Sequence, residues 1–242
     1  MPGLEIILLM CLVVLFAYLV KGISGFAEGM IMMSLCLLFL DIRFILPVLL
    51  VVMLAGDIYN SVRLRRDADW KTIRLALLPS IAGVILGTLL LSALDSALIK
   101  TAFGIFVSLF ALTLLFTKSK VASSRISKWW ALAAGFSGGL IEALLGTGGP
   151  PVVIYLNRAG LKKAAFRATC TAFFLAFNLA RLPAYLFAGI LTVETALVGI
   201  ALIPAMVFGT AIGMKAHGFF DEKMFAKCVA VLLLLAGLKM VF

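Results

Sequence analysis

The sequence predicts an all-α protein that crosses a membrane several times and is built from two inverted repeats. Three observations lead to this prediction: the composition, the spacing of the apolar runs and the placement of the positive charges. Of the 242 residues, 64% are hydrophobic and only 13% are charged, whereas a water-soluble domain carries about 25% charged residues. Lipid rather than water is therefore expected to cover much of the exterior.

Apolar runs close to the roughly 20 residues of a bilayer crossing recur along the chain. We expect six full crossings, at residues 44–63, 73–91, 98–116, 164–187, 193–214 and 224–241. Two further stretches, 4–40 and 129–156, contain clusters of glycine and are interpreted as pairs of short helices that meet at a glycine-rich break. The fold then has about eight to ten helices, depending on how the broken stretches are counted.

The first apolar run resembles a signal peptide in length, but its flanks differ from one. Glu5 occupies a position where a signal peptide has basic residues, and no small-residue cleavage site precedes Lys21. We therefore expect this segment to be a membrane helix of the protein.

The basic residues are gathered in alternate loops. Sixteen of the 21 Lys and Arg residues lie in four groups, at 63–74, 118–128, 158–167 and 215–227. The other loops hold almost none, as around Asp41, Asp95 and Glu194. By the positive-inside rule the basic groups lie in the cytoplasm, which puts both termini outside. The net charge of +10 is thereby explained without a nucleic-acid partner.

The two halves of the chain repeat each other in order. Three matches are found: Gly22-Ile-Ser24-Gly25 with Gly135-Phe-Ser137-Gly138, Asn60-x-x-Arg63 with Asn178-x-x-Arg181, and Gly83/Gly87 with Gly209/Gly213. The topology requires the two halves to be inverted, because one broken stretch starts outside and the other in the cytoplasm. We expect a first repeat at 1–117, a cytoplasmic linker at 118–128 and a second repeat at 129–242. Inverted repeats with paired broken helices are typical of secondary transporters.

The two glycine-rich breaks are the predicted site for a shared anion. Helix N-termini at a break direct free N–H groups and positive dipole ends toward one point. The run from Gly146 to Pro151 is a helix-restart signal, because proline is favoured at the first helical position. We predict substrate contacts at Ser24, Gly25, Gly146, Thr147, Gly148 and Gly149. The glycines at 83, 87, 209 and 213 are interpreted instead as helix-packing positions.

Charged and amide side chains in the apolar layer complete the predicted site, because intramembrane charges are costly and are functional candidates by default. Arg181 can hold an oxyanion with two parallel N–H donors, and Lys21 lies beside the first break. Asn60 and Asn178 add amide donors, and Asp57 lies on the same helix as Asn60. The alternative for Arg181 is that its side chain extends to the lipid headgroups.

Glu28 and Glu142 are the candidates for proton coupling. Each is expected to lie about one helical turn after a break, where a desolvated carboxylate can take up a proton. The alternative is a structural hydrogen bond.

Enzymatic and ATP-driven functions are disfavoured by what the sequence does not contain. The only histidine, His217, has no nucleophile to activate, and no Gly-Lys-Ser/Thr loop for ATP is found. The four cysteines have no metal-ligand spacing. We therefore expect no catalytic residues, no metal and no cofactor.

The chain resembles the TauE/SafE, or sulfite exporter, family of membrane transporters over nearly its whole length. The resemblance rests on Gly22-Ile-Ser-Gly-Phe26, on the basic loop 63–74 before the helix with Pro79, Gly83 and Gly87, and on Gly135-Phe-Ser-Gly-Gly139 followed by Gly146-Thr-Gly-Gly-Pro150. The first break departs from the family, which has more glycine than the Gly-Phe-Ala-Glu-Gly found here.

Membership implies export of sulfite or of an organosulfonate such as sulfoacetate, by a homodimer in the bacterial inner membrane without a prosthetic group. We expect a secondary transporter that works by alternating access. An anion channel, or a transporter of another organic anion, is the alternative.

Overall fold

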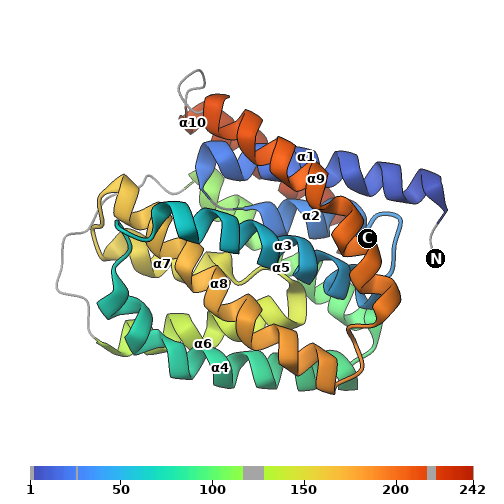
Figure 1. The fold of residues 1–242 in the computed structure, drawn as a ribbon, viewed down its shortest axis with the longest axis horizontal. Helices are drawn as coiled ribbons and strands as arrows, with labels where there is room; N and C mark the ends of the chain where they lie inside the picture. The colour runs from blue at the N-terminus through green and yellow to red at the C-terminus, as the bar shows by residue number, and fades with distance from the viewer. Residues whose placement is uncertain (1–2, 26, 117–127, 217–221, 242) are drawn as a thin grey trace. The chain divides into compact units, whose positions relative to one another are not determined.

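The computed structural model describes residues 3–25, 27–116, 128–216 and 222–241. Within these residues the protein is all-helical, as predicted, with ten helices and no strand. In chain order (Figure 1) the helices are α1 (Leu4–Ser24), α2 (Glu28–Cys36), α3 (Ile42–Leu64), α4 (Trp70–Ala93), α5 (Ser96–Phe116), α6 (Lys128–Leu145), α7 (Gly149–Arg158), α8 (Lys163–Phe187), α9 (Val193–Ala216) and α10 (Glu222–Val241).

Six helices in the described part of the chain are long and apolar enough to cross a membrane. They are α1, α3, α4, α5, α8 and α9, so five of the six predicted crossings are confirmed. The stretch 4–40 forms two helices that meet at a break, as predicted, and the first of them, α1, is an unbroken helix of 21 residues that is long enough to span. The reason is that Gly22 stays helical and the chain first turns at Gly25, where φ is 87°. The predicted crossing at 224–241 forms α10, which is not among the six.

The chain folds into two compact units that do not coincide with the halves of the sequence. Unit 1 comprises Met1–Val52, Leu94–Lys118 and Thr192–Phe242, and unit 2 comprises Met53–Ala93 and Ser119–Leu191. The boundary between the units falls within α3. Of the predicted linker at 118–128, only Lys128 is described, and it begins α6. The rest of the linker, like His217, lies outside the described residues.

In unit 1, α1 and α9 pack against each other in the same direction through glycines of α9. A Cβ on Gly209 would overlap the carbonyl oxygen of Leu15, and one on Gly213 would overlap that of Leu19. The helices α5 and α10 form a second close pair at Gly104 and at a glycine of α10. These glycines let the helix backbones approach closely, as small residues do within membranes.

In unit 2, α4 and α6 lie side by side in the same way (Figure 1). A Cβ on Gly83 would overlap the carbonyl oxygen of Phe136, and one on Gly87 would overlap that of Leu140. The contact also requires glycine on α6, because a Cβ on Gly139 would overlap the backbone carbonyl of a serine of α4. The packing interpretation of the glycine pairs in α4 and α9 is thus confirmed.

The two glycine contacts recur at matched positions in the two units. Gly83 and Gly87 meet residues of α6 that lie 121 positions after those that meet Gly209 and Gly213 on α1. When the two units are aligned by these contacts, the two Gly-x-Ser-Gly segments that were matched in the sequence do not occupy equivalent positions. Gly22 lies three residues before the turn glycine of its break, whereas Gly135 lies eleven residues before Gly146. The inverted orientation of the two halves stays a prediction.

Candidate functional site

The second helix break lies between α6 and α7 in unit 2, where the helix-restart signal predicted it. Gly146 has a positive φ of 68°, which glycine adopts without steric cost. Its N–H donates to the carbonyl oxygen of Glu142 at 2.9 Å and so ends α6. Three residues after Gly146, α7 begins at Gly149, with Pro150 in its first turn. Thr147, between the two helices, is buried.

Glu142 lies one helical turn before this break, not after it as predicted, because α6 continues through the glycines at 135, 138 and 139. Its carboxylate, only 1% exposed, accepts two hydrogen bonds. The backbone N–H of Gly148 donates to Oε2 at 2.6 Å, and Arg181 Nη1 donates to Oε1 at 2.8 Å. One carboxylate therefore connects α6, the start of α7 and α8.

Arg181 is buried inside unit 2, and the snorkelling alternative is wrong. Its side chain is 0% exposed, and besides Glu142 it reaches Asn178 Oδ1 at 3.4 Å. The guanidinium carbon lies 4.8 Å from the centre of the Tyr185 ring. The hydroxyl of Tyr185 donates in turn to the carbonyl oxygen of Ala143 at 2.5 Å, so the aromatic ring is fixed against α6.

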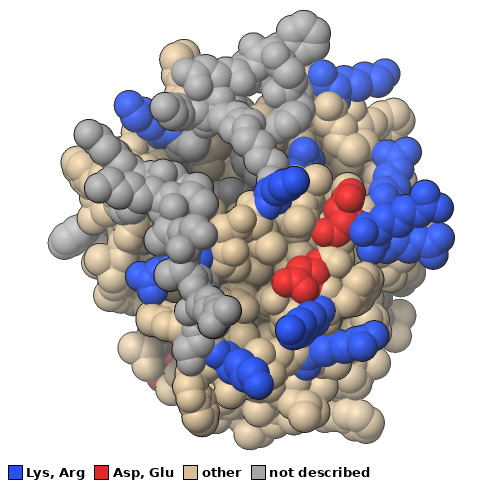
Figure 2. Space-filling model, turned by 90° about the vertical axis from the view of Figure 1, so that its left-hand side faces the viewer, with Lys and Arg blue, Asp and Glu red and all other residues tan. Residues whose placement is uncertain are grey.

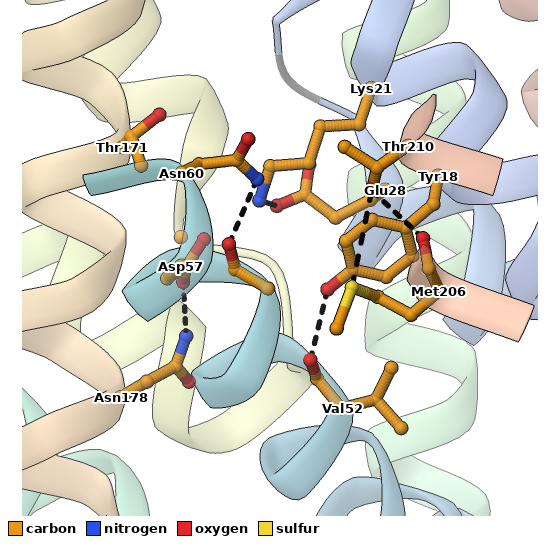
Figure 3. Close-up of polar contacts among 12 residues, drawn as sticks. Tyr18, Lys21, Glu28, Val52, Asp57, Asn60, Thr171, Asn178, Met206 and Thr210 are labelled. Atoms are coloured by element: carbon orange, nitrogen blue, oxygen red, sulfur yellow. Dashed lines mark hydrogen bonds and ion pairs between the residues drawn. The ribbon is translucent and has the colours of Figure 1, made fainter. Parts of the chain in front are cut away.

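Asn178 extends this chain of contacts to α3. Its Nδ2 donates to Asp57 Oδ2 at 2.9 Å, and both side chains are 0% exposed (Figure 3). Asn60 does not join the chain, because its amide donates to the carbonyl oxygen of Gly56 on its own helix at 2.8 Å. Asp57 was named from the sequence as a charged residue of the apolar layer, but it was assigned no contact with substrate. The signal was a carboxylate within an apolar spanning helix, and it did not reveal that Asn178 is the partner of Asp57.

The first break lies in unit 1 and has different chemistry. The N–H of Gly25 donates to the carbonyl oxygen of Lys21 at 2.7 Å, and Ala27 has a φ of 83°. That left-handed conformation costs a non-glycine residue about 1–2 kcal/mol. Lys21 Nζ and Glu28 Oε1, 2.5 Å apart, form a buried ion pair across the break (Figure 3). Glu28 is the first residue of α2, after the break as predicted; the side chain of Ser24 lies outside the described part.

Each break thus contains a buried cation that is already paired with a carboxylate. The sequence alone suggested cations available for an anion, but Lys21 faces Glu28, and Arg181 faces Glu142. In unit 2 these contacts join Arg181 to two carboxylates, to Glu142 directly and to Asp57 through Asn178. Such a cluster can bind an oxyanion at the guanidinium and exchange protons at its carboxylates.

The two glycines at the start of α7 differ in the space around them. A Cβ on Gly148 would overlap the carbonyl oxygen of Gly138 and lie 2.9 Å from Glu142 Cβ. A Cβ on Gly149 would meet only the Phe174 ring, at an ordinary 3.5 Å. The requirement for glycine therefore applies to Gly148, and at Gly149 a single methyl group fits.

One end of unit 2 is strongly basic. The Arg158 guanidinium lies 4.7 Å from the centre of the Trp130 ring, so the α6–α7 hairpin begins and ends at the same end of the unit, as predicted. Exposed basic residues at the neighbouring helix ends are Arg63, Arg65, Arg66, Lys71, Arg74, Lys128 and Lys162. Figure 2 shows Lys and Arg side chains in blue on a face of the molecule. Among the described residues, no three His, Cys, Asp or Glu side chains converge to hold a metal ion.

Comparison with known proteins gives one match. The family model described as "Sulfite exporter TauE/SafE" matches residues 10–240 of the chain. No curated protein and no solved structure matches it. The match covers all ten helices apart from the first residues of α1 and the last of α10, and it agrees with a chain rich in apolar spanning helices. The protein therefore belongs to the sulfite exporter TauE/SafE family and is a multi-pass membrane transporter.

Proposed function

We propose that the protein exports a small sulfur-containing oxyanion, either sulfite or an organosulfonate such as sulfoacetate, by alternating access. The observation that carries this proposal is the fully buried Arg181 beside the Gly148 N–H at a helix break. In a chain of the sulfite exporter family, these are the donors that fit a sulfonate or sulfite head group. A guanidinium and a helix N-terminus both favour anions.

The chemistry of this site is suited to holding an anion without trapping it. A charge-assisted hydrogen bond from Arg181 stabilises a bound oxyanion by about 1.5–3 kcal/mol. The backbone N–H of Gly148 and the start of α7 add partial charge rather than a second full cation. Asn178, within reach of the guanidinium, supplies an amide group that orients it. A binding free energy built from such modest terms permits release.

The first break has a second set of candidate groups. Lys21 and the backbone around Ser24 and Gly25 are proposed to contact substrate within unit 1, and Thr147, Gly146 and Asn60 to contribute within unit 2. Glu28 and Glu142 are proposed as the residues through which transport couples to protons. Both are buried and each is bonded to a cation, so protonation of either carboxylate changes the charge at its break.

We further propose a homodimer in the bacterial inner membrane, with both termini outside. The basic end of unit 2 would then face the cytoplasm, in line with the positive-inside rule. An anion channel is the less favoured alternative, because the buried cations are closed by ion pairs within each unit rather than lining an open path.

The test is transport by the purified protein in proteoliposomes. Labelled sulfite or sulfoacetate should be taken up with saturation and should exchange against unlabelled substrate on the other side, with chloride as the control anion. Arg181→Ala should abolish uptake while the protein stays folded in detergent. Uptake that neither saturates nor shows exchange would indicate a channel, and absence of any sulfur-anion uptake would refute the proposal.

A further inference from the structure

The Glu142 carboxylate accepts hydrogen bonds from the same N–H donors that the proposed function assigns to the substrate. Its Oε1 accepts from Arg181 Nη1 at 2.8 Å and its Oε2 from the Gly148 N–H at 2.6 Å. A carboxylate and a sulfonate are both small oxyanions that accept from such donors. The side chain is part of the protein and is 1% exposed, so in this conformation the site already holds an anion.

We infer that Glu142 is an internal substitute for the substrate, and that the substrate binds by displacing it as it takes up one proton. This inference rests on the proposed function. In the displacement, the carboxylate of Glu142 gains a proton and becomes a neutral carboxylic acid, and its two donors pass to the incoming anion. The net charge of the site then stays unchanged when the arriving head group carries one negative charge.

The surroundings of Glu142 explain why displacement without a proton is unfavourable. From α8 it faces Arg181 and Tyr185, and α3 contributes the carboxylate of Asp57 through Asn178. The start of α7 contributes only an N–H, and the buried polar groups of α4 next to α6 are hydroxyls that do not titrate. An anion added beside the ionised Glu142 would compete with its carboxylate for the same donors and repel it, in a buried site where charge repulsion is poorly screened.

The condition that the net charge of the site stays unchanged also determines which charge the substrate's head group carries. Hydrogen sulfite or a sulfonate group, each a monoanion, replaces the Glu142 carboxylate one for one. A dianionic head group adds a second negative charge to the buried site. The site is thus assigned to sulfur oxyanions whose head group is a monoanion, and each binding event takes up one proton.

Calorimetry on the unaltered protein tests the inference first. The probe is ethanesulfonate, whose charge is constant from about pH 5 to about pH 8, so any pH dependence belongs to the protein. Titrations in two buffers with different ionisation enthalpies should show uptake of about one proton per ethanesulfonate bound. Affinity should rise up to about tenfold for each unit by which the pH falls. Binding without proton uptake would overturn the inference.

The matched variants are Glu142→Gln and Glu194→Gln, the second at an exposed position at the start of α9. Glu142→Gln should bind ethanesulfonate at least as tightly as the unaltered protein at high pH, without proton uptake and without a pH slope. Glu194→Gln should retain both the proton uptake and the pH dependence of binding. A folded Glu142→Gln protein that loses binding, or keeps the proton uptake, would show that Glu142 is no competitor. If Glu142→Gln does not fold, the calorimetry on the unaltered protein decides alone. If the unaltered protein binds neither sulfite nor ethanesulfonate at any pH, the proposed function itself fails.

Discussion

Replacing Arg181 by lysine keeps the positive charge but removes the planar fork of donors, and it therefore tests the proposed anion contact directly. In the structure Nη1 donates to Glu142 Oε1 at 2.8 Å and to Asn178 Oδ1 at 3.4 Å, while the guanidinium lies over the Tyr185 ring. A lysine ammonium has neither the planar guanidinium that lies over the Tyr185 ring nor the fork of parallel N–H donors that an oxyanion can accept from.

The expected loss follows from the value of one charge-assisted hydrogen bond, about 1.5–3 kcal/mol. At 1.4 kcal/mol per decade, ethanesulfonate or sulfite should bind roughly tenfold to a hundredfold more weakly to Arg181→Lys. Titration calorimetry in detergent measures this change, and thermal unfolding checks that the variant is folded.

The chain offers a matched control in Arg63. Its guanidinium also lies 4.8 Å from a tyrosine ring, that of Tyr59, but the arginine is exposed at the end of α3. Exposed cation–π contacts contribute only about 0.5–1 kcal/mol, and none of this concerns the anion, so Arg63→Lys should leave the affinity within about twofold. If a folded Arg181→Lys protein binds as well as Arg63→Lys, then Arg181 is a structural residue and the reasoning is refuted.

Three further predictions concern packing, the buried amide chain and topology. Gly148→Ala should destabilise the protein by about 1–3 kcal/mol, because the methyl group has no space. Gly149→Ala should melt within a few degrees of the unaltered protein. Equal melting temperatures for the two variants would contradict the packing described. Asn178→Leu should cost about 1–3 kcal/mol because it removes the donor to the buried aspartate of α3, and Asn60→Leu should cost less in the same unfolding assay, since that amide bonds only to its own helix. In a variant without its four native cysteines, a cysteine introduced at Arg65 should resist an impermeant thiol reagent in intact cells; labelling there would reverse the predicted orientation.

The sequence by itself determined the class of fold and the positions of most helices. Run length and composition are local properties, so the spans that became α3, α4, α5, α8 and α9 could be predicted closely. The second break was equally local, because glycines and prolines from Gly146 to Pro151 dictate where one helix stops and the next begins. The same local signals identified Arg181 and Asn178 as unusual residues for an apolar helix.

Only the tertiary structure decided what those residues contact. Glu142 lies 39 positions from Arg181, and Asp57 lies 121 positions from Asn178. No local sequence pattern therefore predicts either contact. The partners are set by how α3, α6 and α8 pack, and the pairing of α6 with α4 depends on glycine-to-carbonyl contacts between segments far apart in the chain. Because an intramembrane charge must be neutralised where it is buried, packing rather than sequence fixed the partner of Arg181. Because that partner is Glu142, the donors that the sequence assigned to an anion are already bonded to a carboxylate of the protein.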